Sequence, residues 1–340
     1  MRTDMIKRIG FACKLVDQHG NTVQDMNYRG TTVAWLDRQT KAVAEQRLWD
    51  IMEHNIAATR RVIDLVGSWD HSLRMMRLGS DMLPVYTQAT WSYFWQQPDV
   101  RNYIERELAK VGELARKQDV RLSFHPGQFT VLASESDDIV NRSIEEFEYH
   151  VEMARCMGYG KTWHDHGFKI NVHISGRRGP GGIVSAIGRL SNEGRNLITI
   201  ENEENKYGLD DCLTIGHDVA IVLDVHHHWV NTGEYISPTD DRIQQIESSW
   251  RGVRPTIHYS CSREDILGYH AVDVMPSMPL LLESGYKKQK LRAHSDMMWN
   301  TAVNDWALEF LEHGDIMVES KMKNLASVAL HARYLETFSK

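Results

Sequence analysis

Short β-branched and aliphatic runs alternate along this chain with longer segments whose apolar residues follow helical spacing. The eight runs cover residues 7–13, 74–79, 120–125, 168–174, 196–201, 220–224, 255–260 and 315–319. Predicted helices include residues 45–66, 99–117, 137–157, 239–250 and 321–338. Because eight repeats of strand and helix are typical of a (β/α)8 TIM barrel, the sequence predicts this α/β fold, as a single domain over residues 1–340.

An open, doubly wound sheet is the alternative α/β arrangement. Such a sheet usually carries a glycine-rich phosphate turn after its first strand, but the segment here is Gly10-Phe11-Ala12-Cys13-Lys14. The intervals after the second, fourth and seventh predicted strands exceed the ~2 to 6 residues typical of βα loops. In a barrel, such extended loops lie at the C-terminal face, where active sites are built.

Composition and charge exclude several classes of protein. No apolar run approaches the ~20 residues that span a bilayer, and the start Met1-Arg2-Thr3-Asp4 lacks the hydrophobic stretch of a secretory signal. The four cysteines form no Cys-x-x-Cys pair, which fits a reducing compartment. We therefore expect a cytoplasmic protein with no membrane partner. The net charge of −7 means that any contact with nucleic acid must be local.

Six consecutive predicted strands end in side chains of the types that bind metals. These are His125, His173, Glu201, Asp224, His258 and Glu319, and His227 and His294 are further candidates. Because the C-terminal ends of barrel strands ring one mouth, we expect these side chains to converge there. Imidazoles and carboxylates are the ligands that divalent transition metals require. A single histidine at a strand end is more often structural, but six such strands in succession favour a metal site.

Ordered motifs over nearly the whole chain resemble the UV damage endonuclease family. They are Arg8-Ile9-Gly10-Phe11, Arg77-Leu78-Gly79-Ser80-Asp81-Met82-Leu83-Pro84, His125-Pro126-Gly127-Gln128, Asn171-Val172-His173, Ile200-Glu201-Asn202-Glu203, Leu223-Asp224-Val225-His226-His227, Ile257-His258-Tyr259-Ser260, His294-Ser295-Asp296 and Glu319-Ser320-Lys321-Met322-Lys323. The resemblance implies a TIM barrel related to endonuclease IV, with a site for three metal ions, usually manganese. It also implies nicking of double-stranded DNA immediately 5′ of pyrimidine photoproducts, namely cyclobutane dimers and 6-4 photoproducts, which leaves a 3′-hydroxyl.

The same resemblance assigns the ligands to individual metals. It gives one metal to His125, His173 and Glu201. A second would be held by Glu201, Asp224, His258 and Glu319, with Glu201 bridging, and His227 and His294 would help to hold a third. Glu201, Glu319 and His258 are then the expected catalytic residues. Three divalent cations against three carboxylates leave a net positive pocket for a phosphodiester. We expect a monomer that associates with the nucleoid during repair.

The chain departs from the family pattern at several positions. Thr256 stands where the family commonly has a lysine that is modified to a carbamate and supports the metals, so the choice between two and three ions stays open. Asp296 is a candidate substitute for that oxygen ligand. Gln128 and Phe129 correspond to a Gln-Tyr pair that probes the lesion. Phe11 and Leu15 replace Tyr and Asn, and Phe11 is a further candidate for contact with the lesion.

Basic loop segments are the expected contacts with the DNA backbone. Arg177 and Arg178 follow the fourth predicted strand, and Lys287, Lys288 and Lys290 follow the seventh. These side chains would make affinity depend on salt, although a solvated surface is the alternative interpretation for residues 287–292. An aromatic run after the second strand is either a wedge for DNA or the core of a loop; it comprises Tyr86, Trp91, Tyr93, Phe94 and Trp95.

Two other functions remain open at this stage. Sugar isomerases and epimerases also place histidine and carboxylate ligands at a barrel mouth, although a small sugar needs neither the basic loops nor the Gln128–Phe129 pair. A damage-binding protein that does not cleave is the second alternative, because Thr256 cannot form a carbamate.

Overall fold

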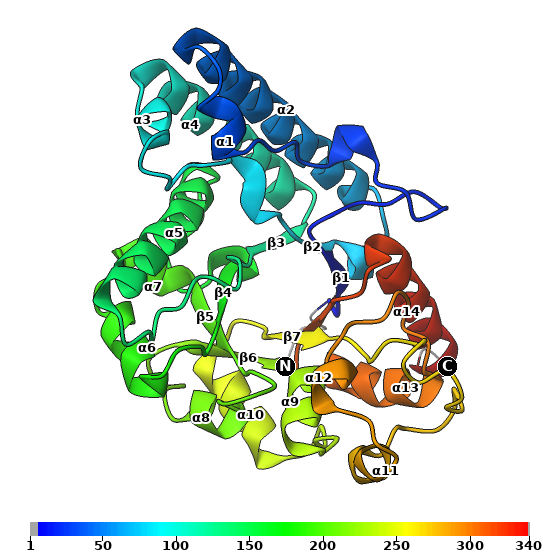
Figure 1. Cartoon of the computed structure of the whole chain (residues 1–340). Helices are drawn as coiled ribbons and strands as arrows, with labels where there is room; N and C mark the ends of the chain where they lie inside the picture. Colours follow the sequence, from blue (N-terminus) through cyan, green and yellow to red (C-terminus); the bar gives the residue numbers. More distant parts are fainter. Residues whose placement is uncertain (1–5, 339–340) are drawn as a thin grey trace.

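The computed structural model describes residues 6–338, so the start Met1–Asp4 lies outside the described residues. Eight parallel strands close into a barrel in sequence order, and helices surround it (Figure 1). The strands are β1 (Ile9–Ala12), β2 (Met75–Arg77), β3 (Arg121–Phe124), β4 (Lys169–His173), β5 (Ile198–Glu201), β6 (Ala220–Asp224), β7 (Thr256–Tyr259) and β8 (Asp315–Val318). The predicted TIM barrel is confirmed, and most strands are one to three residues shorter than predicted.

Five helices match those predicted from the sequence. They are α2 (Lys41–Gly67), α4 (Pro98–Lys117), α5 (Asp137–Cys156), α10 (Asp241–Ser249) and α14 (Lys323–Phe338). The other helices are α1 (Val33–Leu36), α3 (Ser92–Trp95), α6 (Gly179–Ile187), α7 (Asn192–Leu197), α8 (Leu209–Leu213), α9 (Val225–Thr232), α11 (Met278–Glu283), α12 (Lys288–Leu291) and α13 (Thr301–Glu309). Within residues 6–338, no helix is both long and apolar enough to cross a membrane.

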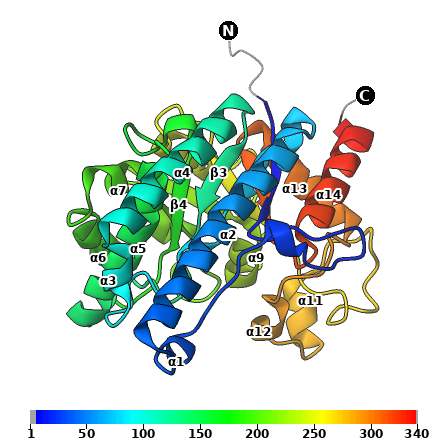
Figure 2. The same ribbon diagram turned by 90° about the horizontal axis from the view of Figure 1, so that it is seen from above.

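Helix ends follow local capping chemistry. The Thr40 side chain accepts a hydrogen bond from the backbone N–H of Val43 at the start of α2, and Pro98 occupies the first turn of α4. Figure 2 shows α1, α11 and α12 at the end of the barrel away from the first described residues. This is the end to which the carboxyl ends of the strands point, so the segments after β1 and β7 carry these helices there.

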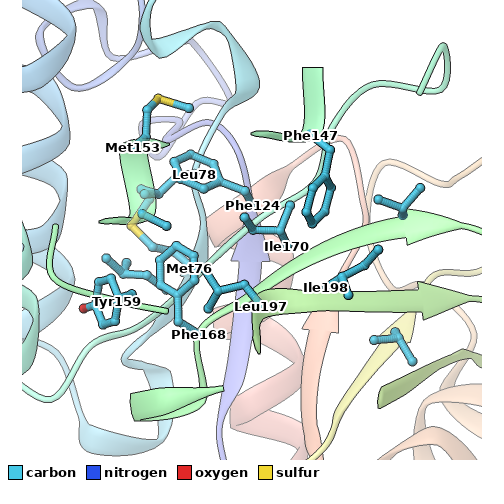
Figure 3. Close-up of a cluster of buried hydrophobic side chains, with 14 of the residues drawn as sticks. Met76, Leu78, Phe124, Phe147, Met153, Tyr159, Phe168, Ile170, Leu197 and Ile198 are labelled. Carbon is cyan, nitrogen blue, oxygen red and sulfur yellow. The ribbon is translucent and has the colours of Figure 1, made fainter. Parts of the chain in front are cut away.

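An apolar layer fills the space between the strands and the outer helices. Figure 3 shows part of this layer, where Phe124 of β3, Ile170 of β4 and Ile198 of β5 pack beside Phe147 of α5. All four side chains are buried. The outward-facing residues of the strands thus hold the helices, which leaves the inward-facing set free to carry polar groups.

The inside of the barrel is polar over much of its length. Arg121 of β3 bonds Asp315 of β8 through Nη1 and Oδ2 at 2.7 Å, and these strands are not neighbours, so the pair crosses the interior. Asp315 also accepts a bond of 2.7 Å from Nε of Arg254. Ala12, Met75 and Met317 form a small apolar cluster of their own. The amino-terminal end of the barrel is therefore closed by one carboxylate that bonds two guanidiniums, and a third, of Arg8, lies 3.9 Å away.

Replacing this buried carboxylate is expected to destabilise the fold. The Asp315→Asn change leaves Arg121 and Arg254 without their counter-charge, and breaking a buried ion pair costs about 3–5 kcal/mol of unfolding free energy. Asp305→Asn is the matched control, because Asp305 pairs with Arg333 at the surface, where such pairs are worth about 0–1 kcal/mol. Urea denaturation measures the unfolding free energy of both variants. Equal stabilities of the two variants would contradict the assignment.

Candidate metal centre

Strand register brings the predicted ligands to one level of the barrel. His173 of β4 is the register partner of Glu201 of β5, and Asp224 of β6 is the partner of His258 of β7. His125 follows β3 directly, and Glu319 follows β8. His258 is the third of four residues in β7 rather than the last, so its imidazole lies inside the barrel and is fully buried.

Glu201 is at the centre of this cluster. Its Oε2 lies 3.3 Å from Nε2 of His125 and 3.1 Å from Nδ1 of His258, and its Oε1 lies 3.5 Å from Nδ1 of His227. Glu319 Oε1 lies 3.3 Å from the same nitrogen of His258. One buried carboxylate therefore faces histidines from three different elements.

Two groups of these side chains are close enough to hold a metal ion. They are His125, His173 and Glu201, and Glu201, Asp224 and His258, in each of which the ligand atoms lie within 4.8 Å of one another. Glu201 belongs to both groups. Buried atoms of three members have no hydrogen-bond partner among the described residues, namely Glu201 Oε1, Asp224 Oδ2 and His258 Nδ1. Unpartnered buried polar atoms are costly, and a cation between them would satisfy all three, so the residues present fit such an ion.

His227, His294 and Glu319 adjoin these groups without belonging to either. His227 Nδ1 lies 3.8 Å from Asp224 Oδ2, and His294 Nδ1 lies 4.0 Å from Glu319 Oε2. The ring centres of the two histidines are 6.4 Å apart. We refer to all eight side chains as the mouth cluster: His125, His173, Glu201, Asp224, His227, His258, His294 and Glu319.

Neighbouring backbone groups orient several of these ligands. Asp224 caps α9, since its Oδ1 accepts a bond of 2.7 Å from the N–H of His227. Nδ1 of His125 lies 3.0 Å from the carbonyl oxygen of Pro126, and Nδ1 of His227 lies 3.0 Å from that of Asn202. Because a carbonyl only accepts, these nitrogens donate, which leaves Nε2 of both rings as the atom that can face a metal ion.

Burial sets the ionisation of the cluster. It lowers the pKa of His173 and of His258 to about 4, so both imidazoles are neutral near pH 7 and keep a lone pair for a metal. Burial also raises the pKa of Asp224 to about 8. The negative charges of Glu201 and Glu319 add to this shift of Asp224, and a divalent cation would reverse it.

Several residues beside the cluster were not singled out from the sequence. Lys169 of β4 is buried, and its Nζ lies 3.2 Å from Nε2 of His258; burial lowers the pKa of this lysine to about 7. Asn171 donates to Glu201 Oε2, and Arg77 of β2 pairs with Glu319. Lys169, Asn171 and His173 are two residues apart along β4, so their side chains share one face of the strand. Because His173 was predicted as a ligand, this spacing could have identified Lys169 and Asn171 as its neighbours.

Thr256 and Asp296 contribute less than the sequence suggested. The Thr256 hydroxyl is buried and has no partner among the described residues. The Asp296 carboxylate pairs with Nζ of Lys321 at 2.9 Å, its side chain is 55% exposed, and it is in neither ligand group. The structure therefore gives no support to Asp296 as the substitute ligand, because a surface lysine already binds it.

The expected DNA-contacting residues are exposed, with one exception. Gln128, Lys287, Lys288 and Lys290 are exposed, and Phe129 is 85% exposed. Arg177 pairs with Glu135 at 3.3 Å, and Arg178 pairs with Asp137 at 2.9 Å, so nearby acids partly neutralise both.

Phe11 is the exception. Its ring is fully buried, and its centre lies 5.9 Å from that of Trp69 in the layer between barrel and helices. The expectation that Phe11 contacts the lesion is wrong, because its position in β1 points the side chain outward from the barrel toward the helices.

The aromatic run after β2 forms the core of its loop. Trp91, Phe94 and Trp95 are buried, and Tyr86 stacks on Tyr149 with ring centres 4.6 Å apart. Tyr93 alone of these five residues is exposed, at 38%. The run therefore supports the second of the two interpretations that the sequence left open.

Comparison with known proteins gives the family. The family model described as UV-endonuclease UvdE matches residues 7–340. The chain belongs to this family. A protein of Bacillus velezensis named UV DNA damage endonuclease is 26% identical over 313 residues, which cover 88% of this chain and 86% of that protein. A Schizosaccharomyces pombe protein named UV-damage endonuclease is 27% identical over 292 residues, which cover 81% of this chain and 44% of that protein.

A solved structure supports the fold. The crystal structure of SacUVDE has a TM-score of 0.72 and 20% identity, and the match covers 98% of this chain and 99% of that chain. Membership in the UvdE family supports a nuclease that acts on UV-damaged DNA, and it decides against the sugar isomerase alternative.

Removing the shared carboxylate is expected to weaken metal binding at both groups. Glu201→Gln takes one negative oxygen from each ligand set, so the Mn²⁺ retained after gel filtration should fall below half of the parent value. Atomic absorption measures the retained Mn²⁺. Glu312→Gln is the control, because Glu312 pairs with Lys7 at the surface and should retain all bound metal. Equal Mn²⁺ contents in the two variants would contradict the shared role of Glu201.

Proposed function

We propose that this protein is a metal-dependent DNA repair endonuclease. It nicks double-stranded DNA immediately 5′ of UV photoproducts, including cyclobutane pyrimidine dimers and 6-4 photoproducts, and leaves a 3′-hydroxyl. The observation that carries the proposal is the pair of buried ligand groups that share Glu201 at the barrel mouth of a UvdE family member. We further propose that the chain acts as a monomer and as one domain.

The mouth cluster would hold two or three divalent ions, for which we propose Mn²⁺. His125, His173 and Glu201 would hold one, and Glu201, Asp224, His258 and Glu319 a second, with His227 and His294 helping to hold a third. Bound divalent ions supply Lewis acidity and neutralise charge on phosphate oxygens. This chemistry suits hydrolysis of a phosphodiester, because charge develops on both the attacking and the leaving oxygen.

The protein groups have roles of their own in this reaction. Glu201, His258 and Glu319 are the proposed catalytic residues. Glu201 Oε1 has no protein donor, so this oxygen of the shared carboxylate would remain available to a bound ion. Asn202 bonds both the N–H and the carbonyl of Asp224, at 2.9 and 3.0 Å, and so fixes that ligand. Asn171 holds Oε2 of Glu201, which limits rotation of the shared carboxylate.

Recognition of the lesion is proposed for the loop after β3. Gln128 and Phe129 follow His125, a member of the mouth cluster, by three and four residues, and both are exposed. An aromatic ring that is 85% exposed offers a flat surface on which an unstacked base can pack. Arg177, Arg178, Lys287, Lys288 and Lys290 would contact backbone phosphates, which makes affinity dependent on salt.

A defined substrate tests the reaction. A duplex oligonucleotide with one cyclobutane dimer is expected to be nicked 5′ of the dimer in the presence of Mn²⁺ and to stay intact in EDTA. A DNA polymerase should extend the nicked strand directly, because the product ends in a 3′-hydroxyl. Equal cutting of an undamaged duplex would contradict the proposal. Tight binding without cutting would favour the damage-binding alternative.

Substitution of Phe129 tests the lesion probe. Phe129→Ser removes a stacking surface worth about 1–3 kcal/mol per base, so kcat/KM on the dimer substrate should fall by about tenfold or more. Phe129→Tyr keeps the ring and should stay close to the parent. The melting temperature should not change, because the side chain is exposed. Tyr93→Ser, in the loop after β2, is the control; a similar loss in that variant would argue against a specific role for Phe129.

A further inference from the structure

Two cations lie on the β8–β1–β2 side of the mouth and have no role in the function proposed above. Arg77 ends β2, and Lys323 begins α14 four residues after Glu319. Between β2 and β8, strand β1 contributes the small residue Ala12 to the apolar cluster inside the barrel. The short side chain leaves room for the Arg77 guanidinium to reach Glu319 across the end of β1.

Arg77 is only partly satisfied by its protein contacts. Its Nη1 pairs with Oε1 of Glu319, and its Nε lies 3.4 Å from Sγ of Cys13. No residue within 6–338 accepts a hydrogen bond from Nη2. The side chain is 13% exposed, so protein does not fully enclose the guanidinium. A planar edge with free N–H groups is the part of arginine that binds phosphate oxygens in a bidentate manner.

Lys323 is half-buried and lacks a counter-charge. The structure gives its Nζ no hydrogen-bond acceptor and no ion-pair partner among the described residues, whereas nearby Lys321 pairs with Asp296. Burial lowers the pKa of Lys323, and the charge of Arg77 adds to this shift while Glu319 opposes it. Lys323 also stands at the amino end of a 16-residue helix, where the helix dipole disfavours a cation.

One carboxylate therefore has two roles. Glu319 is the acid that neutralises Arg77, and it is also a proposed metal ligand. Once a metal ion shares its charge, Arg77 would lose most of its neutralisation. Two neighbouring cations beside the amino end of a helix then favour an anion.

We propose that Arg77 and Lys323 form a subsite for a backbone phosphate of the DNA strand that enters the mouth. The inference rests on the proposed function and deepens it, since it assigns phosphate-binding residues on the side of the mouth opposite β4–β6. The contact is independent of base sequence and fixes the register of the strand relative to the mouth cluster. Because Glu319 neutralises Arg77 in the absence of metal, the subsite is stronger in the metal-loaded protein.

The salt dependence of DNA binding tests the subsite. The probe is a fluorescent duplex with one cyclobutane dimer, whose 5′ linkage is a phosphonate analogue that keeps its charge but resists cleavage. Fluorescence anisotropy gives Kd for the full-length protein in Mn²⁺ over about 50–200 mM salt, and each lost phosphate contact lowers the slope of log Kd against log salt by about 0.9. Lys323→Met and Arg77→Met should each lower the slope by this amount.

A matched control and a metal comparison separate phosphate binding from a structural role. Lys110→Met removes an exposed lysine that pairs with Glu107 on α4, and it should leave the slope unchanged. The deficit of Arg77→Met should be larger in Mn²⁺ than in EDTA. Parent-like slopes in both variants would overturn the subsite. A deficit that accompanies loss of bound Mn²⁺ or a lowered melting temperature in Lys323→Met would also overturn it, in favour of a structural role.

The two proposals fail in different ways. If the parent protein does not nick the dimer substrate but the slopes change as expected, the subsite stands and the endonuclease proposal falls. If the parent nicks correctly while both slopes stay at the parent value, the subsite alone is wrong.

Discussion

The position of one carboxylate, Glu201, organises the functional end of this molecule. It ends β5 inside a closed ring of strands, and histidines from β3, β7 and α9 face it. A buried negative charge is costly unless hydrogen bonds and opposite charges surround it. Asn171 supplies one donor, and Oε1 has none, so the protein by itself leaves the charge incompletely satisfied. That incompleteness is what makes the site suited to a cation.

Charge inside the barrel is arranged in levels along its axis. Asp315 with Arg121 and Arg254 closes the amino-terminal end, Lys169 lies below His258, and the carboxylates of the mouth cluster occupy the other end. At each level, a positively charged side chain contacts a negatively charged or a neutral polar side chain. The apolar core lies outside the strands instead, between them and the helices. The outward-facing side chains of the eight strands therefore pack against the helices, and the inward-facing side chains supply the polar groups of the candidate site.

Much of this could be predicted from the sequence, for identifiable reasons. The period of apolar residues located all eight strands, because outward-facing side chains must pack on helices whatever the rest of the fold does. His173, Glu201 and Asp224 stood at strand ends, and closure of the parallel strands into a barrel brings these ends together. Phe11 was misjudged because a family position indicates a residue type but not the direction of its side chain. The pairing of Asp296 with Lys321 could not be predicted, because it is evident only in the folded chain.

The sequence alone determined the barrel, the ligand types at its mouth and the family, because these depend on local periodicity and on the order of motifs. Only the tertiary structure decided which atoms meet. The contact of Arg77 with Glu319, the approach of Lys169 to His258 and the pairing of Arg121 with Asp315 each join strands that are not neighbours in the barrel. Such contacts depend on barrel closure and on the room that small residues such as Ala12 leave, and no spacing along the chain encodes those distances.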